Sequence, residues 1–357
     1  MPLLPLHGHE TLRRRLDDAI RRDALPGSLL LQGPMGIGKQ RLALWLGQRL
    51  LCPGAEPRPC GSCQHCRYAL AGTHPDIHWY FPRPRLKDPD PSPEDVEDDF
   101  REAVGDRTKI GVYPPPPPED AILIATIRAM AHSASLLPAL GARKVYVLGD
   151  ADRLVVREDS EFAAGAFLKL LEEPPPRATI VLTSSEPGAL IPTIRSRVVA
   201  LRVPPLSPDA VDAVLAEPAM RDALAAAGAP QRVEEQRRLA AGAPGALLAR
   251  GEWADALVRA RSMLDAAVAG DRREQMRAAL VQGGARARGA FSTSLDALTT
   301  LLHERARAAV ERGNLPGARA AASALDALEE AKELATGNVN PQLITSELLR
   351  RLEAVLR

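Results

Sequence analysis

The stretch that decides the fold is LQGPMGIGKQ, residues 31–40. It follows a short apolar run in GSLLLQG (27–33), which predicts a buried strand, and it leads into the helical spacing of apolar residues over 39–51. A glycine-rich loop between a strand and a helix can bind phosphate, because its backbone N–H groups and the helix N-terminus face the anion. Four residues stand where a nucleoside-triphosphate site needs them: Gly33, Gly36, Gly38 and Lys39. A plain strand-to-helix turn with an exposed lysine is the alternative.

The residue that follows the lysine departs from this pattern. Gln40 stands where a phosphate-binding loop places the Ser or Thr that ligates magnesium. Magnesium requires near-octahedral oxygen ligands, and phosphoryl transfer depends on the metal to neutralise developing charge. We therefore expect a loop that can bind ATP or ADP but that hydrolyses it poorly.

Further strand and helix patterns follow along the chain. RKVYVLGDADRL (143–154) and ATIVLTSSEP (178–187) each predict a buried strand, and FLKLLEEPP (167–175) predicts a helix that ends at proline. Strands that alternate with helices predict an α/β domain with a parallel sheet over residues 1–203. The acidic, proline-rich segment 81–120 interrupts it, and we expect an exposed, poorly ordered insertion there.

No strand pattern returns after VPPLSP (203–208). Residues 204–250 contain patterns of short helices, and 251–357 is rich in Ala, Leu and Arg with apolar residues on one helical face, as at Leu295, Leu298 and Leu302. We expect a small helical domain over 204–250 and a helical bundle over 251–357.

All four cysteines lie in one short segment: Cys52, Cys60, Cys63 and Cys66. Four thiolates with two-residue spacers match a closed, structural zinc site. Unpaired structural cysteines and a redox pair are the alternatives. His65 lies between two of the ligands, but four cysteines already fill a tetrahedral site, so we expect its side chain to point outward.

The overall composition gives no strong signal for nucleic acid or a membrane. The formal net charge of the chain is +1. No run of about 18 apolar residues is present, and the first residues lack the charged-then-apolar pattern of a secretory signal. We expect a cytoplasmic protein without a membrane partner.

Two further stretches carry charged residues at strand ends. Asp150 and Asp152 follow the predicted strand in VYVLGDADRL. They stand where the second acidic motif of a nucleotide site would lie; the alternative is that they are surface acids at a strand end. TIRSRV (193–198) places two arginines after the last predicted strand. These arginines could pair with surface acids, or one could reach the phosphates bound by another subunit.

Taken together, these stretches resemble a known family. GPMGIGK, the four-cysteine loop, AGTHPD (71–76), FLKLLEEPP, TSSEP (183–187), TIRSR (193–197) and NPQL (340–343) occur in the order found in bacterial DNA polymerase III clamp-loader subunits, which have the AAA+ fold. The likeness covers nearly the whole chain and is greatest for the delta-prime branch. It implies an AAA+ P-loop domain with a zinc module (52–66), a helical lid domain and a C-terminal collar domain.

Carried over by position, the resemblance implies a loss of hydrolysis. The acidic pair of the family falls at Gly149 and Asp150, and the lid arginine falls at Gly245. Ser185 occupies the position of the polar residue that closes the third strand. Lys39 is retained.

The same comparison implies that an arginine finger is retained. Ser196 and Arg197 match the Ser-Arg-Cys motif, with Val198 in place of Cys. A subunit that has lost its own hydrolysis but kept this arginine would complete the site of its neighbour.

The resemblance therefore implies a non-hydrolysing clamp-loader subunit that helps to load the sliding clamp onto primed DNA. Its implied partners are the gamma/tau and delta subunits, with the clamp and primer-template DNA contacted through the complex. Nothing resembles a two-metal carboxylate centre, so polymerase activity would belong to the holoenzyme. An active gamma/tau-type ATPase and a zinc module that binds DNA directly are the alternatives.

Overall fold

The computed structural model describes residues 3–117, 120–154, 161–249, 252–282, 288–335 and 339–357. The chain divides into two compact units, Met1–Leu248 and Ala249–Arg357. The separation of 204–250 from the α/β domain, and the domain limits given above, stay predictions.

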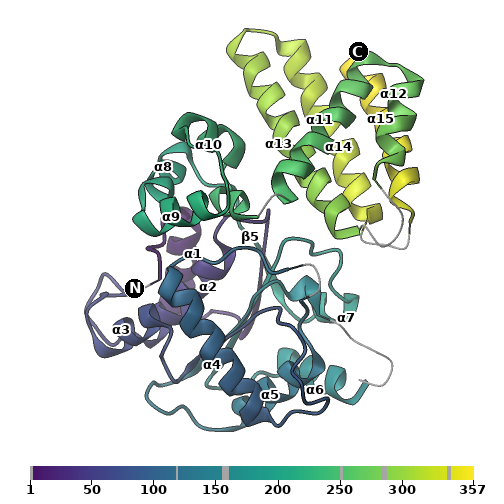
Figure 1. The fold of residues 1–357 in the computed structure, drawn as a ribbon. Coiled ribbons are helices and arrows are strands. Elements are labelled where there is room, and N and C mark those ends of the chain that lie inside the picture. The colour runs from purple at the N-terminus through teal and green to yellow at the C-terminus, as the bar shows by residue number, and fades with distance from the viewer. Residues whose placement is uncertain (1–2, 118–119, 155–160, 250–251, 283–287, 336–338) are drawn as a thin grey trace. The chain divides into compact units, whose positions relative to one another are not determined.

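The first unit is built on a five-stranded sheet in the order β2-β3-β4-β1-β5. The strands are β1 Ser28–Gln32, β2 Ile77–Tyr80, β3 Lys144–Leu148, β4 Ala178–Ser184 and β5 Val199–Arg202, and all neighbouring pairs are parallel. The middle residues of the central strands, 29–31, 145–148 and 180–182, are buried and apolar because both faces of a parallel sheet are covered. The predicted α/β fold with a parallel sheet is confirmed (Figure 1).

Helices surround this sheet. They are α1 Glu10–Arg21, α2 Lys39–Leu51, α3 Gln64–Ala71, α4 Pro93–Ile110, α5 Ile124–Ser135, α6 Glu161–Glu172 and α7 Pro192–Arg195, with a 3-10 turn η1 at Ala151–Arg153. Helix α2 packs on β1, β3 and β4, and Leu42 and Leu46 on it are fully buried. Because parallel strands end at one edge of the sheet, the loops after β1, β3 and β4 meet there.

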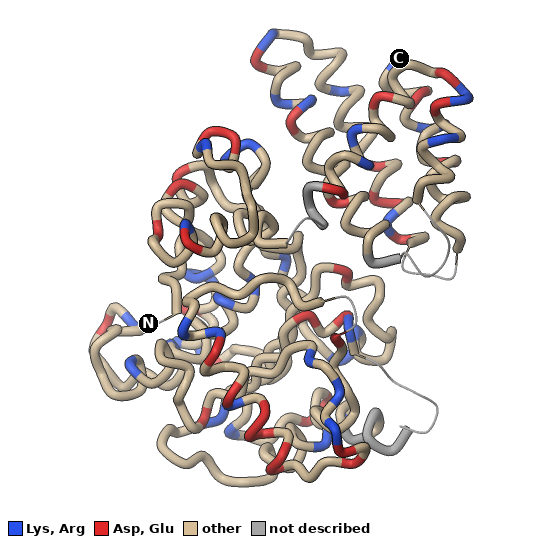
Figure 2. The backbone as a smooth tube through the Cα atoms, viewed as in Figure 1, with Lys and Arg blue, Asp and Glu red and all other residues tan. Residues whose placement is uncertain are grey.

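Helix α4 corrects the expectation of a poorly ordered insertion at 81–120, which is wrong over residues 93–110. Ser92 and Asp95 form a capping box, and Pro93 occupies the first turn. Val96 and Phe100 lie on the buried face, while the helix also carries many acidic residues and a few basic ones (Figure 2). Acidic and proline-rich composition concealed this apolar spacing. Residues 118 and 119 lie outside the described ranges.

A buried carboxylate holds the loop that follows α5. The Asp76 side chain is fully buried and accepts hydrogen bonds from the backbone N–H groups of Ala139, Leu140 and Gly141 at 2.6, 2.8 and 2.6 Å. The same loop exposes Leu137, which is 79 % accessible. The buried carboxylate therefore anchors the backbone of this loop, while the Leu137 side chain is exposed to solvent.

The remainder of the first unit is helical. It contains α8 Pro208–Ala216, α9 Pro218–Ala226, α10 Val233–Ala240 and a 3-10 segment η3 at Pro244–Leu248. Ser207 caps α8 through its hydroxyl, which accepts the N–H of Ala210.

The second unit consists of helices in the part that the structure describes: α11 Glu252–Ala269, α12 Arg272–Leu280, α13 Arg288–Glu311, α14 Leu315–Ala335 and α15 Pro341–Leu356. Helix α13 packs against both α11 and α14, and α15 packs against α11, α12 and α14. Leu295, Leu298 and Leu302 are fully buried on α13, as their spacing predicted. The helical C-terminal region is confirmed. No described helix is long and apolar enough to cross a membrane.

Candidate functional site

The loop between β1 and α2 has the backbone conformation of a phosphate-binding loop. Gly36 and Gly38 adopt φ of +80° and +90°, which disfavours residues with a Cβ. Helix α2 begins at Lys39, directly after Gly38. The loop therefore presents a helix N-terminus at the carboxyl edge of the sheet, where an anion would bind.

Lys39 and Ser185, predicted from separate segments, are in contact. Lys39 is buried, with 5 % of the residue exposed, and its ammonium donates to the carbonyl oxygens of Gly33 and Pro34 at 2.8 Å and to Ser185 Oγ at 2.9 Å. The backbone N–H of Ser185 in turn donates to Asp152 Oδ1 at 3.1 Å. In this arrangement the ammonium holds the loop closed onto the end of β4.

The Gln40 side chain also bonds within the protein. Its Nε2 donates to Asp150 Oδ2 at 2.9 Å, and its Oε1 accepts from the indole Nε1 of Trp79 at 2.9 Å. Burial raises the pKa of Asp150, and the neighbouring Asp152 raises it further, against the opposite effect of Lys39. The predicted residue Asp150 thus faces Gln40.

A cation from α4 completes this network. Arg107 places its NH1 3.4 Å from Gln40 Oε1, and its Cζ lies 3.3 Å from the ring centroid of Phe81 and 5.0 Å from those of Trp79 and Tyr113. Burial lowers the pKa of Arg107 to about 10, so it stays charged at neutral pH. Sequence reasoning missed Arg107 and Trp79, because no local pattern shows that β2 and α4 reach this loop.

Two glycines, at positions where the sequence resemblance implies functional side chains, each permit a close approach. A Cβ at Gly149 would lie 2.5 Å from Cδ and Oε1 of Gln40. Gly245 donates its backbone N–H to Gly36 O at 3.0 Å, and a Cβ at Gly36 would lie 2.1 Å from the backbone nitrogen of Ala246. The phosphate-binding loop is therefore packed directly against the backbone of η3.

The four cysteines form a compact cluster of thiols. Their Sγ atoms all lie within 4.8 Å of one another, with Cys60–Cys66 at 4.0 Å and Cys52–Cys63 at 3.9 Å. Four sulfurs about 2.3 Å from a tetrahedral zinc would be separated by about 3.8 Å. Backbone N–H groups also point at the sulfurs, as from Cys63 to Cys60 Sγ at 3.4 Å, and these bonds lower the pKa of Cys60 to about 6. The cluster could hold a metal ion, and the donor set fits zinc.

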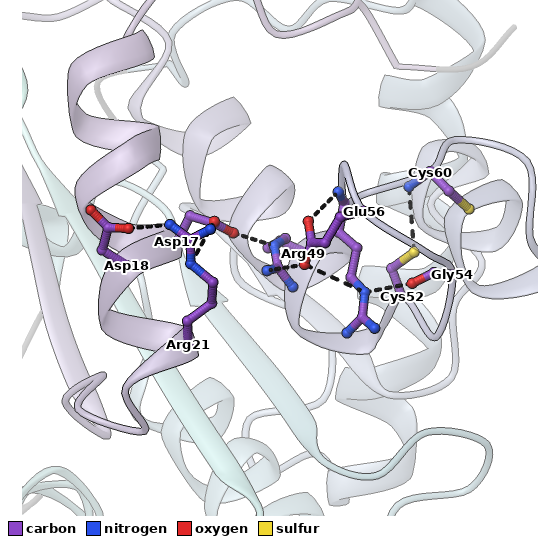
Figure 3. Close-up of polar contacts among 9 residues, drawn as sticks. Asp17, Asp18, Arg21, Arg49, Cys52, Gly54, Glu56 and Cys60 are labelled. Atoms are coloured by element: carbon purple, nitrogen blue, oxygen red, sulfur yellow. Dashed lines mark hydrogen bonds and ion pairs between the residues drawn. The ribbon is translucent and has the colours of Figure 1, made fainter.

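Ion pairs tie this module to the first two helices (Figure 3). Arg49 of α2 is 3 % exposed and binds Asp17 of α1 at 2.5 Å and Glu56 of the cysteine loop at 3.1 Å. The Arg58 Nε donates to Gly54 O in the same loop.

His65 lies beside the cluster but bonds elsewhere. Its Nδ1 is 2.9 Å from Nε2 of the buried His74. The half-buried ring of His65 packs on this second histidine. It is absent from the group of possible metal ligands among the described residues.

Arg197 lies on the surface after α7. Its side chain is 30 % exposed; Nε donates to Glu172 Oε2 at 3.1 Å, and NH1 donates to Thr193 O at 3.0 Å. Glu172 belongs to FLKLLEEPP and is itself 59 % exposed. The structure thus joins two of the stretches that carry the family resemblance, and it orients the guanidinium from two sides.

Comparisons with known proteins agree with the resemblance found in the sequence. The sequence family described as "DNA polymerase III, delta subunit" matches residues 8–207. DNA polymerase III subunit delta' of Escherichia coli is 33 % identical over 225 residues, which are 62 % of this chain and 53 % of that protein. The Bacillus subtilis delta' subunit is 29 % identical over 202 residues, 57 % of this chain and 49 % of that protein.

A further relative carries a different subunit name. The tau/gamma subunit of Haemophilus influenzae is 26 % identical over 191 residues, 53 % of this chain and 22 % of that protein. The chain spans about half the length of the delta' relatives it matches. Since the family match covers more than half of this chain, the chain belongs to the DNA polymerase III delta subunit family.

Proposed function

We propose that the chain is a non-hydrolysing subunit of the DNA polymerase III clamp loader, which acts in the cytoplasm and helps to load the sliding clamp onto primed DNA. The observation that carries this proposal is the Gln40 amide, which bonds to Asp150 and Trp79 at the position where an ATPase needs a magnesium ligand. The names of the delta' and tau/gamma relatives support membership of the same assembly.

In this proposal Arg197 acts on the nucleotide of a neighbouring gamma/tau subunit. An arginine finger has to be accessible and oriented, and Arg197 is partly exposed and held by Glu172 and Thr193 O. A finger supplied by a second protein stabilises the charge that develops during phosphoryl transfer and can raise the rate on the order of 10³-fold. The gamma/tau and delta subunits would bind through the helical second unit.

The cysteine cluster has a structural role in this proposal. Four thiolates leave no open position for catalysis, so a bound zinc would stabilise the loop that follows α2. The phosphate-binding loop would bind ATP or ADP without hydrolysing it. It retains Gly33, Gly36, Gly38 and Lys39 but has no magnesium ligand after the lysine.

Reconstitution with gamma/tau and delta tests the proposal. Arg197→Ala should lower the DNA-stimulated ATPase of the complex and clamp loading by at least about tenfold, since the finger acts on the transition state. Assembly, followed by gel filtration, should be unchanged. Arg195→Ala is the matched control, because Arg195 is an exposed arginine at the end of α7.

Two results would contradict the proposal. If the complex with Arg197→Ala kept full ATPase activity and clamp loading, Arg197 would not act as an arginine finger. Turnover of ATP by the isolated chain, lost on Lys39→Ala, would instead support the active gamma/tau-type ATPase.

A further inference from the structure

The side chains at the magnesium position of the phosphate-binding loop do not fit a magnesium ion. A P-loop holds Mg²⁺ through the hydroxyl after its lysine and an acid after a neighbouring strand, and the ion takes oxygen ligands at about 2.0–2.1 Å. Here the Gln40 amide nitrogen, a donor, faces Asp150 Oδ2 at 2.9 Å, and Gln40 Oε1 already accepts the indole N–H of Trp79. An N–H group directed at the carboxylate occupies the side from which a cation would approach it.

The space around residue 149 also leaves no room for an acidic metal ligand there. A Cβ on residue 149 would lie 2.5 Å from Cδ and Oε1 of Gln40 and 2.7 Å from its Nε2, so the amide fills the space of a side chain at 149. The φ of Gly149 lies outside the left-handed region, so the backbone does not itself require glycine there. A side chain at residue 149 would therefore have to displace the Gln40 amide, which Asp150 and Trp79 hold in place.

The charge balance also points to a replacement of the metal by protein groups. Asp150 lies at the end of β3 next to a second acid, Asp152. The guanidinium of Arg107 reaches Gln40 Oε1 from α4 and is fixed over the ring of Phe81. The Gln40 amide thus bridges the Arg107 cation to the Asp150 carboxylate, and Arg107 acts on that carboxylate electrostatically together with Lys39.

We propose that Gln40 and Arg107 together take the place of the divalent cation, and that Gln40 and Gly149 form a coupled pair. The loop keeps its phosphate-binding shape without magnesium, and any polyphosphate that binds there does so independently of divalent metal. An acidic side chain at 149 is tolerated only when residue 40 is shortened. This inference concerns the loop alone and holds whether or not Arg197 acts in trans.

A double-mutant cycle on the full chain tests the coupling. The variants are Gln40→Thr, Gly149→Asp and the two together, each unfolded thermally with and without added Mg²⁺ in chelator-free buffer, which leaves the cysteine cluster untouched. Gly149→Asp alone should lower the Tm by about 5 °C or more, because its side chain collides with a held amide. In the Gln40→Thr background the same substitution should lower the Tm by less than half as much. Gly105→Asp on α4 is the control for a glycine-to-acid change, since a Cβ at residue 105 meets no atom within 4 Å.

The metal dependence of the same variants gives a second readout. The Tm of the wild type should be equal with and without added Mg²⁺ in chelator-free buffer, whereas Mg²⁺ should raise the Tm of the double variant, which restores a hydroxyl and an acid to the site. Additive effects of the two substitutions would overturn the coupled pair. A wild-type Tm that rises with Mg²⁺ would overturn the replacement of the cation. Neither result depends on the activity of a reconstituted complex.

Discussion

Asp76 gives the sharpest test of how the first unit is stabilised. Its fully buried carboxylate accepts three backbone N–H bonds, from residues 139, 140 and 141. Asp76→Ala leaves these amides without their acceptor. A hydrogen bond to a charged group contributes about 1.5–3 kcal/mol, and water can reach part of this loop, so we expect a loss of about 4 kcal/mol in the free energy of unfolding. For a unit of this size that corresponds to a fall in Tm of roughly 8–16 °C.

The pH dependence of this loss has a definite sign. Burial alone would raise the pKa of Asp76, but the N–H groups of Gly141, Ala139 and Leu140 outweigh it, so the pKa lies below its ordinary value. A carboxyl with a lowered pKa stabilises the fold at pH values above its unfolded pKa, about 3.9, and this contribution is lost as the pH falls through the folded pKa. The Tm difference between wild type and Asp76→Ala should therefore be constant from pH 7 to about pH 5 and should shrink in stronger acid.

Thermal unfolding followed by intrinsic fluorescence at a series of pH values measures this difference. Asp98→Ala is the control, since Asp98 is 70 % exposed on α4 and pairs only with a surface arginine. A Tm loss in Asp76→Ala no larger than in the control, or a difference that grows on acidification, would refute the reasoning.

Two further predictions concern the metal module and the phosphate-binding loop. The purified chain should contain about one zinc, measured by elemental analysis, and Cys63→Ser should lose most of it; full zinc content in that variant would exclude the four-thiolate site. Gly36→Ala should lower the Tm by several degrees, because φ at residue 36 is +80° and the new Cβ would lie 2.1 Å from the backbone nitrogen of Ala246. Gly105→Ala, in open space on α4, should leave the Tm unchanged or raise it, and equal effects of the two substitutions would show that the close approach to η3 is absent.

The sequence predicted the features that depend on local pattern. The strands at 28–32, 144–148 and 178–184 are each centred on a short apolar run, and the loop at 33–38 is marked by its glycines. The cysteine cluster was visible from ligand type and spacing. Each of these signals lies within about a dozen residues, where side-chain period and turn chemistry are decisive.

The remaining features depend on contacts between distant segments. Helix α4 was missed because its acids and flanking prolines outweighed four buried apolar positions. Arg107 and Trp79 meet Gln40 only through the tertiary fold, 67 and 39 residues away along the chain. Gly149 stood in the sequence as a lost acid, whereas the structure gives a steric reason for it, which no spacing of residues reveals.

The fit between Gln40 and Gly149 has a consequence for any attempt to build a metal site into this loop. Restoring an acid at residue 149 while Gln40 is present forces a collision, and shortening Gln40 first leaves the indole N–H of Trp79 and the carboxylate of Asp150 without their partner. Either substitution alone, at residue 40 or at residue 149, is therefore expected to lower the stability of the fold, and the two effects are coupled. Residues 40 and 149 should therefore be replaced together in any design that gives this loop a metal site.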